Sequence, residues 1–528
     1  MKETLFYNGQ FHTMVSEEDT KSWMLVRGGR IAAIGSGEPD TEKYPERVDL
    51  QGQHVYPCLI DGHTHMLLTI AVMAMGFNAC EITPEGVEPH TVAGVAERVK
   101  EYASRQKKNA VIAINNYILT AIDERRMPTK EELDEWGGGR AVVIYNIDGH
   151  STSLSSKMLE MVGIDPGSSS GVLQGEENER AQGRIIDKVG SSVGLSALAK
   201  GIANFHNYCA EYGIGMVGAL EGNGDSLKDS TTKLIIKLAR HFDVKVRLYL
   251  QYRDPERVKP FEKLMKNKRA GGCGDWEMDG ASGSHSAAFS VPYKDTGKSS
   301  PCYYTQEEAD KMVKSFADSG YQIASHAIGD LAINRIIESL NKTGGSMMHR
   351  IEHCEFHDDA AFAELAKGRY AVMMQPGYAW IDKRYLHTYE QYLPDEIRGR
   401  MKFKSLMDAG ICVCGSSDSP VQDMDPYLQM LGMTEFYVPE ESVSAYDAMR
   451  SFTVNAAKSM LEEADYGSLE AGKAADFFTA GSDFFKLGPS EITGFRPNKT
   501  YYGGIPYRKK SGSLFELLLM MLKKPHSI

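Results

Sequence analysis

The sequence predicts an α/β protein built around a (β/α)8 barrel, the TIM-barrel architecture, with a composite β-sandwich and an inserted lid region. Strand-like apolar runs recur along the chain, and helical stretches separate them. Polar residues close most of these runs, at the strand ends where barrel enzymes place their chemistry. Both chain ends carry further short strands with turn signals that stand outside this repeat. Together these observations favour one large barrel with appended β-structure.

Eight apolar runs are expected to form the barrel. The first ends at His63 and His65, and the others span residues 215–221, 244–250, 275–280, 322–326, 349–353, 370–376 and 411–418. The distance from the first run to the second is too long for one βα unit, so residues from about 76 to 205 hold an insertion. It contains an expected amphipathic helix at 92–104, a helix start capped by Thr129 and a Gly- and Ser-rich stretch. We interpret this insertion as a mobile cover or lid.

The two chain ends are expected to build one β-sandwich together. Residues 1–57 contain short strands, and this unit is too small to bury its apolar face alone. Residues 461–510 supply a turn and an apolar strand, so we infer that the two ends pair. The barrel with its insertion then takes residues 58–460. Residues 511–528 form a C-terminal helix that we expect to pack against the protein, with a dimer contact or a membrane-surface role as alternatives.

Length, charge and cysteine usage narrow the class of protein. With 528 residues the chain can bury a large core and form more than one domain. A formal net charge of -12 argues against nucleic acid as a partner, because phosphate binding needs a basic face. We find no signal peptide and no apolar run that reaches the roughly 20 residues of a membrane span. The eight cysteines have no C-x-x-C spacing, so we expect a reduced, cytoplasmic protein that acts on a small molecule, with a homodimer left open.

Four histidines and one aspartate close predicted barrel strands: His63, His65, His326, His353 and Asp418. His63 and His65 are two residues apart, so they share one face of their strand. In a parallel barrel the ends of all strands meet at one mouth. Imidazole nitrogens and a carboxylate oxygen suit Zn²⁺, and also Fe²⁺ or Mn²⁺. The pattern therefore predicts a centre for one or two divalent metal ions.

Asp418 is the candidate catalytic residue. A bound divalent ion lowers the pKa of its water to about 7. A carboxylate beside that water can take its proton and pass it to a leaving nitrogen. The residues at the barrel mouth therefore favour hydrolysis assisted by a metal, with Asp418 as the proton shuttle.

Seven stretches spread over nearly the whole chain resemble the metal-dependent amidohydrolase superfamily. They are 59–65, 148–151, 279–283, 325–330, 350–353, 415–420 and 467–476. Within the superfamily they are similar to amidohydrolase family 3, in the branch of the N-substituted formamide deformylase-like proteins. The resemblance implies a (β/α)8 barrel with a composite β-sandwich and the metal ligands named above, with Asp418 also as proton shuttle. It further implies that His150, in the inserted region, contacts the substrate from the cover.

The fourth predicted strand departs from the pattern that this resemblance implies. Many amidohydrolases carry a carboxylated lysine there, which bridges two metals, whereas this chain offers Asp275, Glu277 and Asp279. These acids alternate and share one face, where like charges repel unless a cation or protons intervene. We place Glu277 first as a ligand because its side chain is longer, and Asp279 as a substrate contact. The alternatives are a centre with a single metal ion and acids that are solvated at the strand end.

Three further residues have predicted positions. His285 follows the fourth strand and can face the mouth, where it would contact substrate; a surface role is the alternative. Arg350 and Glu352 lie on the sixth strand near His353. Because of the alternation along a strand, we expect Glu352 to face away from His353 and to form an ion pair with Arg350 between the barrel and its helices.

The sequence therefore predicts a metal-dependent hydrolase of a non-peptide C–N bond, in a small amide, an N-formyl or N-acyl amine, or a cyclic amide. A deaminase of an amino-heterocycle is the closest alternative, and release of ammonia would identify it. A metal-binding protein without turnover is disfavoured, because structural zinc takes four ligands that are usually rich in Cys. Hydrolysis of a C–O or P–O ester is a third alternative.

Overall fold

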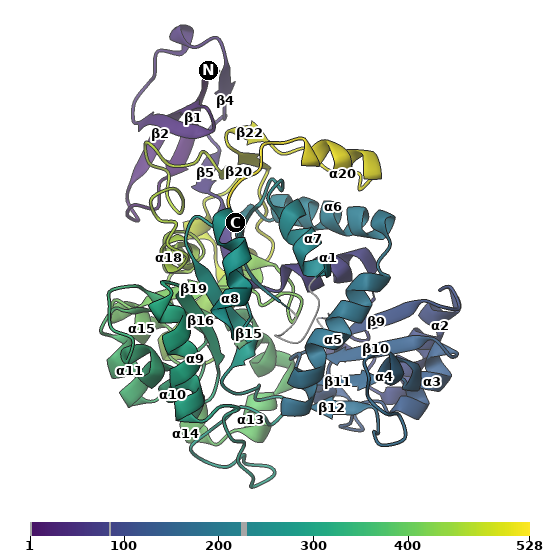
Figure 1. The fold of residues 1–528 in the computed structure, drawn as a ribbon. Coiled ribbons are helices and arrows are strands. Elements are labelled where there is room, and N and C mark those ends of the chain that lie inside the picture. The colour runs from purple at the N-terminus through teal and green to yellow at the C-terminus, as the bar shows by residue number, and fades with distance from the viewer. Residues whose placement is uncertain (1–2, 76, 84–85, 223–229) are drawn as a thin grey trace.

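The computed structural model describes residues 3–75, 77–83, 86–222 and 230–528 (Figure 1). At its centre is a parallel sheet of eight strands that are neighbours in chain order. They are β6 (Leu59–Thr64), β13 (Ile214–Glu221), β14 (Lys245–Leu250), β15 (Arg269–Glu277), β16 (Gln322–Ala327), β17 (His349–His353), β18 (Tyr370–Met374) and β19 (Cys412–Gly415). The exit of β19 returns to β6, where Asp418 N donates to His63 O at 2.9 Å. The predicted (β/α)8 barrel is thereby confirmed.

Helices between the strands cover the outside of the barrel (Figure 1). They include α6 (Leu195–Glu211), α8 (Pro255–Val258), α9 (Gln306–Asp318), α10 (Asp330–Asn341), α11 (Asp359–Leu365) and α15 (Lys404–Asp408). In α9 the buried side chains are Ala309, Met312, Val313 and Phe316, the spacing of one apolar helix face. Thr305 begins this helix with a capping box that it forms with Glu308. The amphipathic pattern therefore fixes which side of α9 faces the strands.

The barrel interior is a packed core. Ile60, Met216, Leu220 and Tyr249 point inward and form one buried cluster. Alternate residues of the same strands, such as Val217, belong to the large cluster between strands and helices. Both faces of each strand are thus covered, which explains why the strands read as continuous apolar runs rather than as alternating ones. Most polar groups therefore lie at the strand ends.

The fourth strand begins earlier than the sequence predicted. We expected it at 275–280, whereas β15 spans Arg269–Glu277, with an irregularity in its pairing to β16 between Gly272 and Glu277. Three glycines with positive φ lie in this strand, and glycine normally weakens a strand assignment. A Cβ on Gly271 would lie 2.0 Å from the carbonyl oxygen of Ala324, so the strands approach too closely here for any larger residue.

Both chain ends contribute to one further sheet. Its N-terminal strands are β1 (Glu3–His12), β2 (Thr20–Arg27), β3 (Arg30–Gly35), β4 (Arg47–Asp49) and β5 (His54–Pro57), and its C-terminal strands are β20 (Phe477–Ala480), β21 (Lys499–Tyr502) and β22 (Ile505–Pro506). Strand β20 pairs antiparallel with β5 and so joins the two ends. The rings of Phe477 and Tyr501 stack at 4.5 Å, and Phe6 meets Phe477 edge-on. The expected pairing of the ends is present, and the two-layered sandwich stays a prediction.

The insertion after the first barrel strand forms a body of its own, at the right of Figure 1. Its four-stranded sheet contains β9 (Val111–Tyr117), β10 (Ala141–Asn146), β11 (Ser151–Leu154) and β12 (Val172–Gln174), with α2 (Val92–Ser104), α3 (Lys130–Gly137), α4 (Ser156–Met161) and α5 (Glu176–Ser192) around it. Helix α2 has the predicted limits, and Thr129 caps α3 as predicted. Two buried clusters form its core, and one of them also includes Ile381 and Leu386, which follow β18. Its motion as a lid stays a prediction.

The C-terminal helix α20 (Leu514–Met521) packs through only a small part of its surface. Met520 is 4% exposed, whereas Phe515 and Leu518 are 70% and 62% exposed. The expected packing is therefore partial, and the homodimer stays a prediction. Among the described residues, no helix combines the length and apolar character that a membrane crossing needs. All eight cysteines are free.

Candidate metal centre

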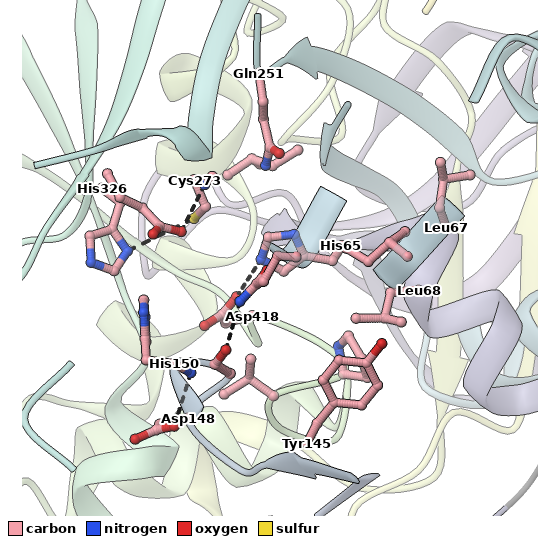
Figure 2. A pocket seen from close by; sticks show the side chains of 18 of the residues that line it. His65, Leu67, Leu68, Tyr145, Asp148, His150, Gln251, Cys273, His326 and Asp418 are labelled. Carbon is pink, nitrogen blue, oxygen red and sulfur yellow. Dashed lines mark hydrogen bonds and ion pairs between the residues drawn. The ribbon is translucent and has the colours of Figure 1, made fainter. Parts of the chain in front are cut away.

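The five predicted residues meet at the mouth of the barrel, and Figure 2 shows three of them, His65, His326 and Asp418. Asp418 Oδ1 lies 3.0 Å from His63 Nε2 and 3.2 Å from His65 Nε2. The His353 ring lies 5.0 Å from that of His63 and 4.4 Å from that of His326, between centroids. His65, His326, His353 and Asp418 line a cavity, and His63 is fully buried beside it. The structure thus brings together groups that are up to 355 positions apart in the sequence.

A buried carboxylate fixes the first and last strands at this point. Asp61 accepts hydrogen bonds from Ser417 N at 3.0 Å, from Ser417 Oγ at 2.5 Å and from His63 N at 3.3 Å. Asp418 itself has φ of 59°, a left-handed conformation that turns its side chain back toward His63. Asp61 therefore holds the histidine strand and the aspartate loop in a fixed relation.

Hydrogen bonds on the far side of each imidazole orient its other nitrogen toward the centre. His63 Nδ1 donates to Glu352 Oε2 at 2.7 Å, and His353 Nδ1 donates to Gln375 Oε1 at 2.7 Å. His326 Nε2 contacts the carbonyl oxygen of Gly280 at 3.4 Å. Each partner only accepts, so each of these nitrogens carries the proton and the opposite nitrogen keeps its lone pair for a metal.

Cys273 occupies the middle of the group, and the sequence analysis did not find it. Its Sγ lies 3.5 Å from His63 Nε2 and 4.0 Å from both His326 Nδ1 and His353 Nε2. The misplaced start of the fourth strand concealed it. The available signal was the run of glycines around it, since glycine inside a strand marks a close approach of two backbones.

Burial and neighbouring charges act on these groups in opposite directions: at His63 burial lowers the pKa, but the neighbouring Asp418 and Cys273 outweigh it and hold the pKa of that imidazole well above its usual value. Burial lowers the pKa of His353 to about 4, and it lowers the pKa of His326 well below the usual value, so both imidazoles are neutral, as metal ligands must be. Burial also raises the pKa of the Cys273 thiol to about 12. Burial opposes ionisation of Asp418, but His63 and His65 outweigh it and hold the pKa of that carboxyl well below its usual range.

Arg350 and Glu352 lie inside the barrel, which corrects the position expected from strand alternation. They form an ion pair at 2.8 Å, both side chains are fully buried, and the Arg350 guanidinium packs over the Tyr249 ring of the interior cluster. His353 has φ of 66°, so the chain leaves the regular pleat at that residue. This turn brings His353 over the rim while Glu352 faces His63 from the interior.

The other predicted site residues have different surroundings. Glu277 is 4% exposed, accepts from Gly274 N at 2.7 Å and lines the cavity together with His150. Asp279 is fully buried and accepts from the backbone N–H groups of Ala288, Ile328 and Gly329 at 2.8, 3.0 and 2.8 Å, so it joins two loops rather than facing the cavity. His285 pairs with Asp295 at 2.8 Å and does not line the cavity.

The inserted body forms one wall of the cavity. Its polar contributions include Asn115, Asn116, Asp148 and His150, and Figure 2 shows His150 and Asp148 on the side opposite Cys273. Leu67 and Leu68, at the start of α1 (Met66–Met75), form an apolar wall. A second cavity shares Asp418, His353 and His150 with the first and extends toward other side chains: Ser282, Glu355, Tyr378, Tyr389 and Gln422.

The donor set of the centre fits a divalent metal ion. It combines imidazole nitrogens that are held by acceptors behind them, one thiol and Asp418 Oδ1, which has no hydrogen-bond partner among the described residues and lies beside His63 and His65. Oriented imidazoles of this kind are typical of metal ligands. A barrel with such a donor set at its rim belongs to the class of metal-dependent hydrolases.

Comparison with known sequences agrees with this class. The pattern of the amidohydrolase family matches residues 46–506, so the chain belongs to this family of hydrolases that act on C–N bonds. The resemblance found in the sequence is thereby confirmed. The putative amidohydrolase YtcJ of Bacillus subtilis is 22% identical over 96% of this chain and 100% of its own. N-substituted formamide deformylase of Arthrobacter pascens is 21% identical over 97% of this chain and 99% of its own.

Solved structures support the fold. An uncharacterized metal-dependent hydrolase from Pyrococcus horikoshii has a TM-score of 0.73 and 20% identity, and covers 93% of this chain and 99% of its own. The corresponding hydrolase from Pyrococcus furiosus has a TM-score of 0.69 and 22% identity, with 92% and 100% covered. At these identities the likeness concerns the barrel architecture.

Proposed function

We propose that this protein hydrolyses the C–N bond of a small amide, an N-formyl or N-acyl amine, or a cyclic amide. The observation that carries the proposal is the position of Asp418, with one oxygen 3.0 Å and 3.2 Å from two imidazoles at a cavity floor. The full-length similarity to a formamide deformylase supports an amide substrate.

We propose His63, His65, His326, His353 and Asp418 as metal ligands, with Cys273 beside them. A thiol among imidazoles favours Zn²⁺ over harder ions, because soft sulfur ligands select zinc. Cys273 stands on the fourth barrel strand, where amidohydrolases with two metals carry a bridging lysine, and its contacts to three imidazoles suit the same bridging role. A bound ion would ionise the thiol despite its raised pKa.

The metal would supply an acidified water and polarise the carbonyl oxygen of the substrate. Asp418 is ionised in this environment, so it can accept a proton from the attacking water as the C–O bond forms. It then returns that proton to the nitrogen as the C–N bond breaks, and an acid and an amine leave. Gln375 and Glu352 keep the imidazoles in place throughout, because each accepts a hydrogen bond from a histidine nitrogen on its far side.

Two cavities that meet at Asp418 suggest how a substrate lies. The first shares Leu67, Leu68 and Ile186 with an apolar pocket between α1, α5 and α6. The second leads toward Tyr378 and Tyr389. We propose that the amide lies at Asp418 with an apolar substituent toward the leucines and its other half toward the tyrosines. His150 lines both cavities and is the proposed contact from the inserted body.

Metal analysis followed by a substrate screen tests the proposal. Protein purified without chelator is expected to contain zinc and to release an amine and an acid from members of a panel of N-formyl, N-acyl and cyclic amides. Release of ammonia from amino-heterocycles instead would assign the deaminase alternative. Bound metal with no turnover across both panels would reject the hydrolase.

A further inference from the structure

We propose that the inserted body and the barrel share a second cation site, made of His150, Glu179 and Glu277, in which a divalent metal ion ties α5 to β15. These residues come from three segments: the loop after β10, the first turns of α5 and the end of β15. The proposal concerns how the cover is held and does not depend on the reaction proposed above.

The geometry of the three side chains suits one ion. Each offers a ligand atom, and these atoms all lie within 4.8 Å of one another. His150 Nδ1 and Glu179 Oε1 are 2.9 Å apart. Two ligands at right angles around an ion, each bonded at roughly 2.1 Å, are separated by about 3 Å. An imidazole with two carboxylates is a donor set that Zn²⁺ and Mn²⁺ both accept.

Burial and charge point to a missing positive charge. The side chains of His150 and Glu179 are 9% and 8% exposed, and Glu277 is 4% exposed. Among the described residues, Glu179 Oε2 and Glu277 Oε2 are buried and accept no hydrogen bond. Burying ionised carboxylates without compensation is costly, and a single imidazolium balances only one of the two. A divalent ion would neutralise both.

A proton shared between the carboxylates is the competing explanation. Burial and the neighbouring Glu179 raise the pKa of Glu277 well above its usual range, which either a proton or a cation can relieve. The two carboxylate oxygens without a hydrogen-bond partner among the described residues, Glu179 Oε2 and Glu277 Oε2, favour the cation. His150 Nδ1 donates to Glu179 Oε1, so an ion would take the place of that proton, and the His150 ring lies 5.3 Å from that of His326, so the cluster continues the row of ligand groups at the barrel mouth.

The site would make closure of the cover depend on metal. Glu277 belongs to the barrel and also lies within ligand distance of Cys273 and His326. His150 and Glu179 belong to the inserted body, which walls the cavity. An ion bound among the three side chains therefore fixes that wall beside the catalytic centre, and its removal leaves two buried carboxylates facing each other across the boundary.

Ion counting tests the proposal with a matched pair of variants. Glu179→Gln removes one ligand charge, whereas Glu177→Gln removes the same charge from an exposed position of the same helix. The chain, saturated with Zn²⁺ and then freed of loosely held ions, is analysed for metal by mass spectrometry. We expect Glu179→Gln to hold one ion fewer per chain than the wild type, and Glu177→Gln to hold the same number.

Two further readouts identify the ion that is lost. In a Co²⁺ titration, the thiolate-to-cobalt charge-transfer band of Cys273 is expected to persist in Glu179→Gln, while the part of the visible absorption due to the nitrogen–oxygen site disappears. Limited proteolysis within residues 76–205 is expected to be faster in Glu179→Gln than in Glu177→Gln. His150→Asn serves as a second ligand variant should Glu179→Gln fold poorly.

An equal ion count in Glu179→Gln, His150→Asn and the wild type would overturn the proposal and leave the shared proton as the explanation. That outcome is distinguishable from a failure of the proposed function. Loss of amide hydrolysis in Asp418→Asn together with an unchanged ion count in Glu179→Gln would retain the hydrolase and remove this site.

Discussion

Among the described residues, two clusters contain two histidines and one aspartate, and they lie at two different sheets. The rim cluster, His63, His65 and Asp418, lies at the barrel mouth. The end-sheet cluster, His12, His54 and Asp483, lies where the two chain ends pair. In each cluster the three ligand atoms lie within 4.8 Å of one another. By composition and spacing they are equivalent, yet their hydrogen bonds differ.

The polar atoms of the end-sheet cluster form hydrogen bonds and ion pairs with one another and with neighbouring residues. His12 Nε2 and His54 Nδ1 hydrogen-bond to each other at 2.9 Å. Asp483 Oδ1 accepts from Tyr56 OH at 3.3 Å and Phe485 N at 3.2 Å, while Oδ2 pairs with Lys486 at 3.2 Å. The two ligand nitrogens face each other and both Asp483 oxygens have partners, whereas Glu179 Oε2 and Glu277 Oε2 at the boundary of the inserted body have none among the described residues.

In the rim cluster, a residue that does not belong to the cluster orients His63. Glu352 accepts from His63 Nδ1, which leaves Nε2 directed at Asp418, and Asp418 Oδ1 has no hydrogen-bond partner in the part of the chain that the structure describes. The presence of histidines therefore does not distinguish a metal centre from a hydrogen-bonded core. The distinction lies in the residues that accept a hydrogen bond from the far nitrogen of each imidazole.

The largest expected effect follows from Asp418→Asn. The amide keeps the size of the carboxylate but cannot accept and return a proton, and it is a weaker metal ligand. We expect the rate of amide hydrolysis to fall by about a thousandfold or more, within the range of general acid–base catalysis. Steady-state kinetics measure the effect. Asp483→Asn in the end-sheet cluster is the matched control and should retain at least half of the activity; equal losses in both variants would remove the distinction between the clusters.

Glu352→Gln tests the partner behind His63. Loss of this carboxylate should weaken zinc binding about 10- to 100-fold, the effect usual for a partner of a metal-bound histidine. It also leaves Arg350 buried without its counter-charge, at a cost of about 3–5 kcal/mol in unfolding free energy. Competition with a zinc chelator and denaturant unfolding measure the two effects.

Glu462→Gln separates the two consequences. Glu462 is as buried as Glu352 and forms ion pairs with Arg247 at 2.8 Å and Arg269 at 2.6 Å. These ion pairs do not involve the rim histidines. We expect this variant to lose stability to a similar extent while its zinc affinity stays within about twofold of the wild type. Equal losses of zinc affinity would show that stability alone explains the result for Glu352.

The sequence predicted the barrel and the rim histidines because both depend on regular strands. A residue that ends a parallel strand must reach the mouth, so His63, His326 and His353 could be placed together without coordinates. The eight apolar runs were all present, and seven had nearly the right limits. The fourth failed because the glycines around Cys273 break the pattern by which a strand is recognised.

The remaining parts of the site depend on contacts that a sequence pattern does not contain. Glu352 faces His63 because the chain turns at His353, and strand alternation predicts the opposite side. Glu179 lies on a helix of the inserted body, and its approach to Glu277 follows from how that body rests on the barrel. Such contacts between separately folded parts have no local signal in the residues themselves.

His12→Gln tests whether the end-sheet cluster binds a metal ion. The side-chain amide of glutamine can either donate to or accept from His54, so it can replace His12 Nε2 in this hydrogen bond. We expect the number of zinc ions per chain to stay the same, and the unfolding free energy at pH 8 to fall by about 1 kcal/mol for one altered hydrogen bond. His65→Ala, measured in parallel, should lose metal. A loss of one ion in His12→Gln would make the end-sheet cluster a metal site after all.

The end-sheet cluster should also make the stability of the protein depend on pH. Burial, with help from His54 and Lys486 and against Asp483, lowers the pKa of His12 to about 4. In the unfolded chain the pKa of a histidine is about 6.5, so between pH 6.5 and 4 the unfolded chain binds a proton at His12 and the folded protein does not. The free energy of unfolding must therefore fall as the pH drops from about 6.5 to 4. We expect His12 to contribute about 2 kcal/mol to this fall, since solvent at the ring edge reduces the full linkage. Denaturant unfolding at intervals across this range measures it. His12→Gln should show a flatter profile below pH 6.5 than the wild type, and parallel profiles would mean that His12 is protonated in the folded protein.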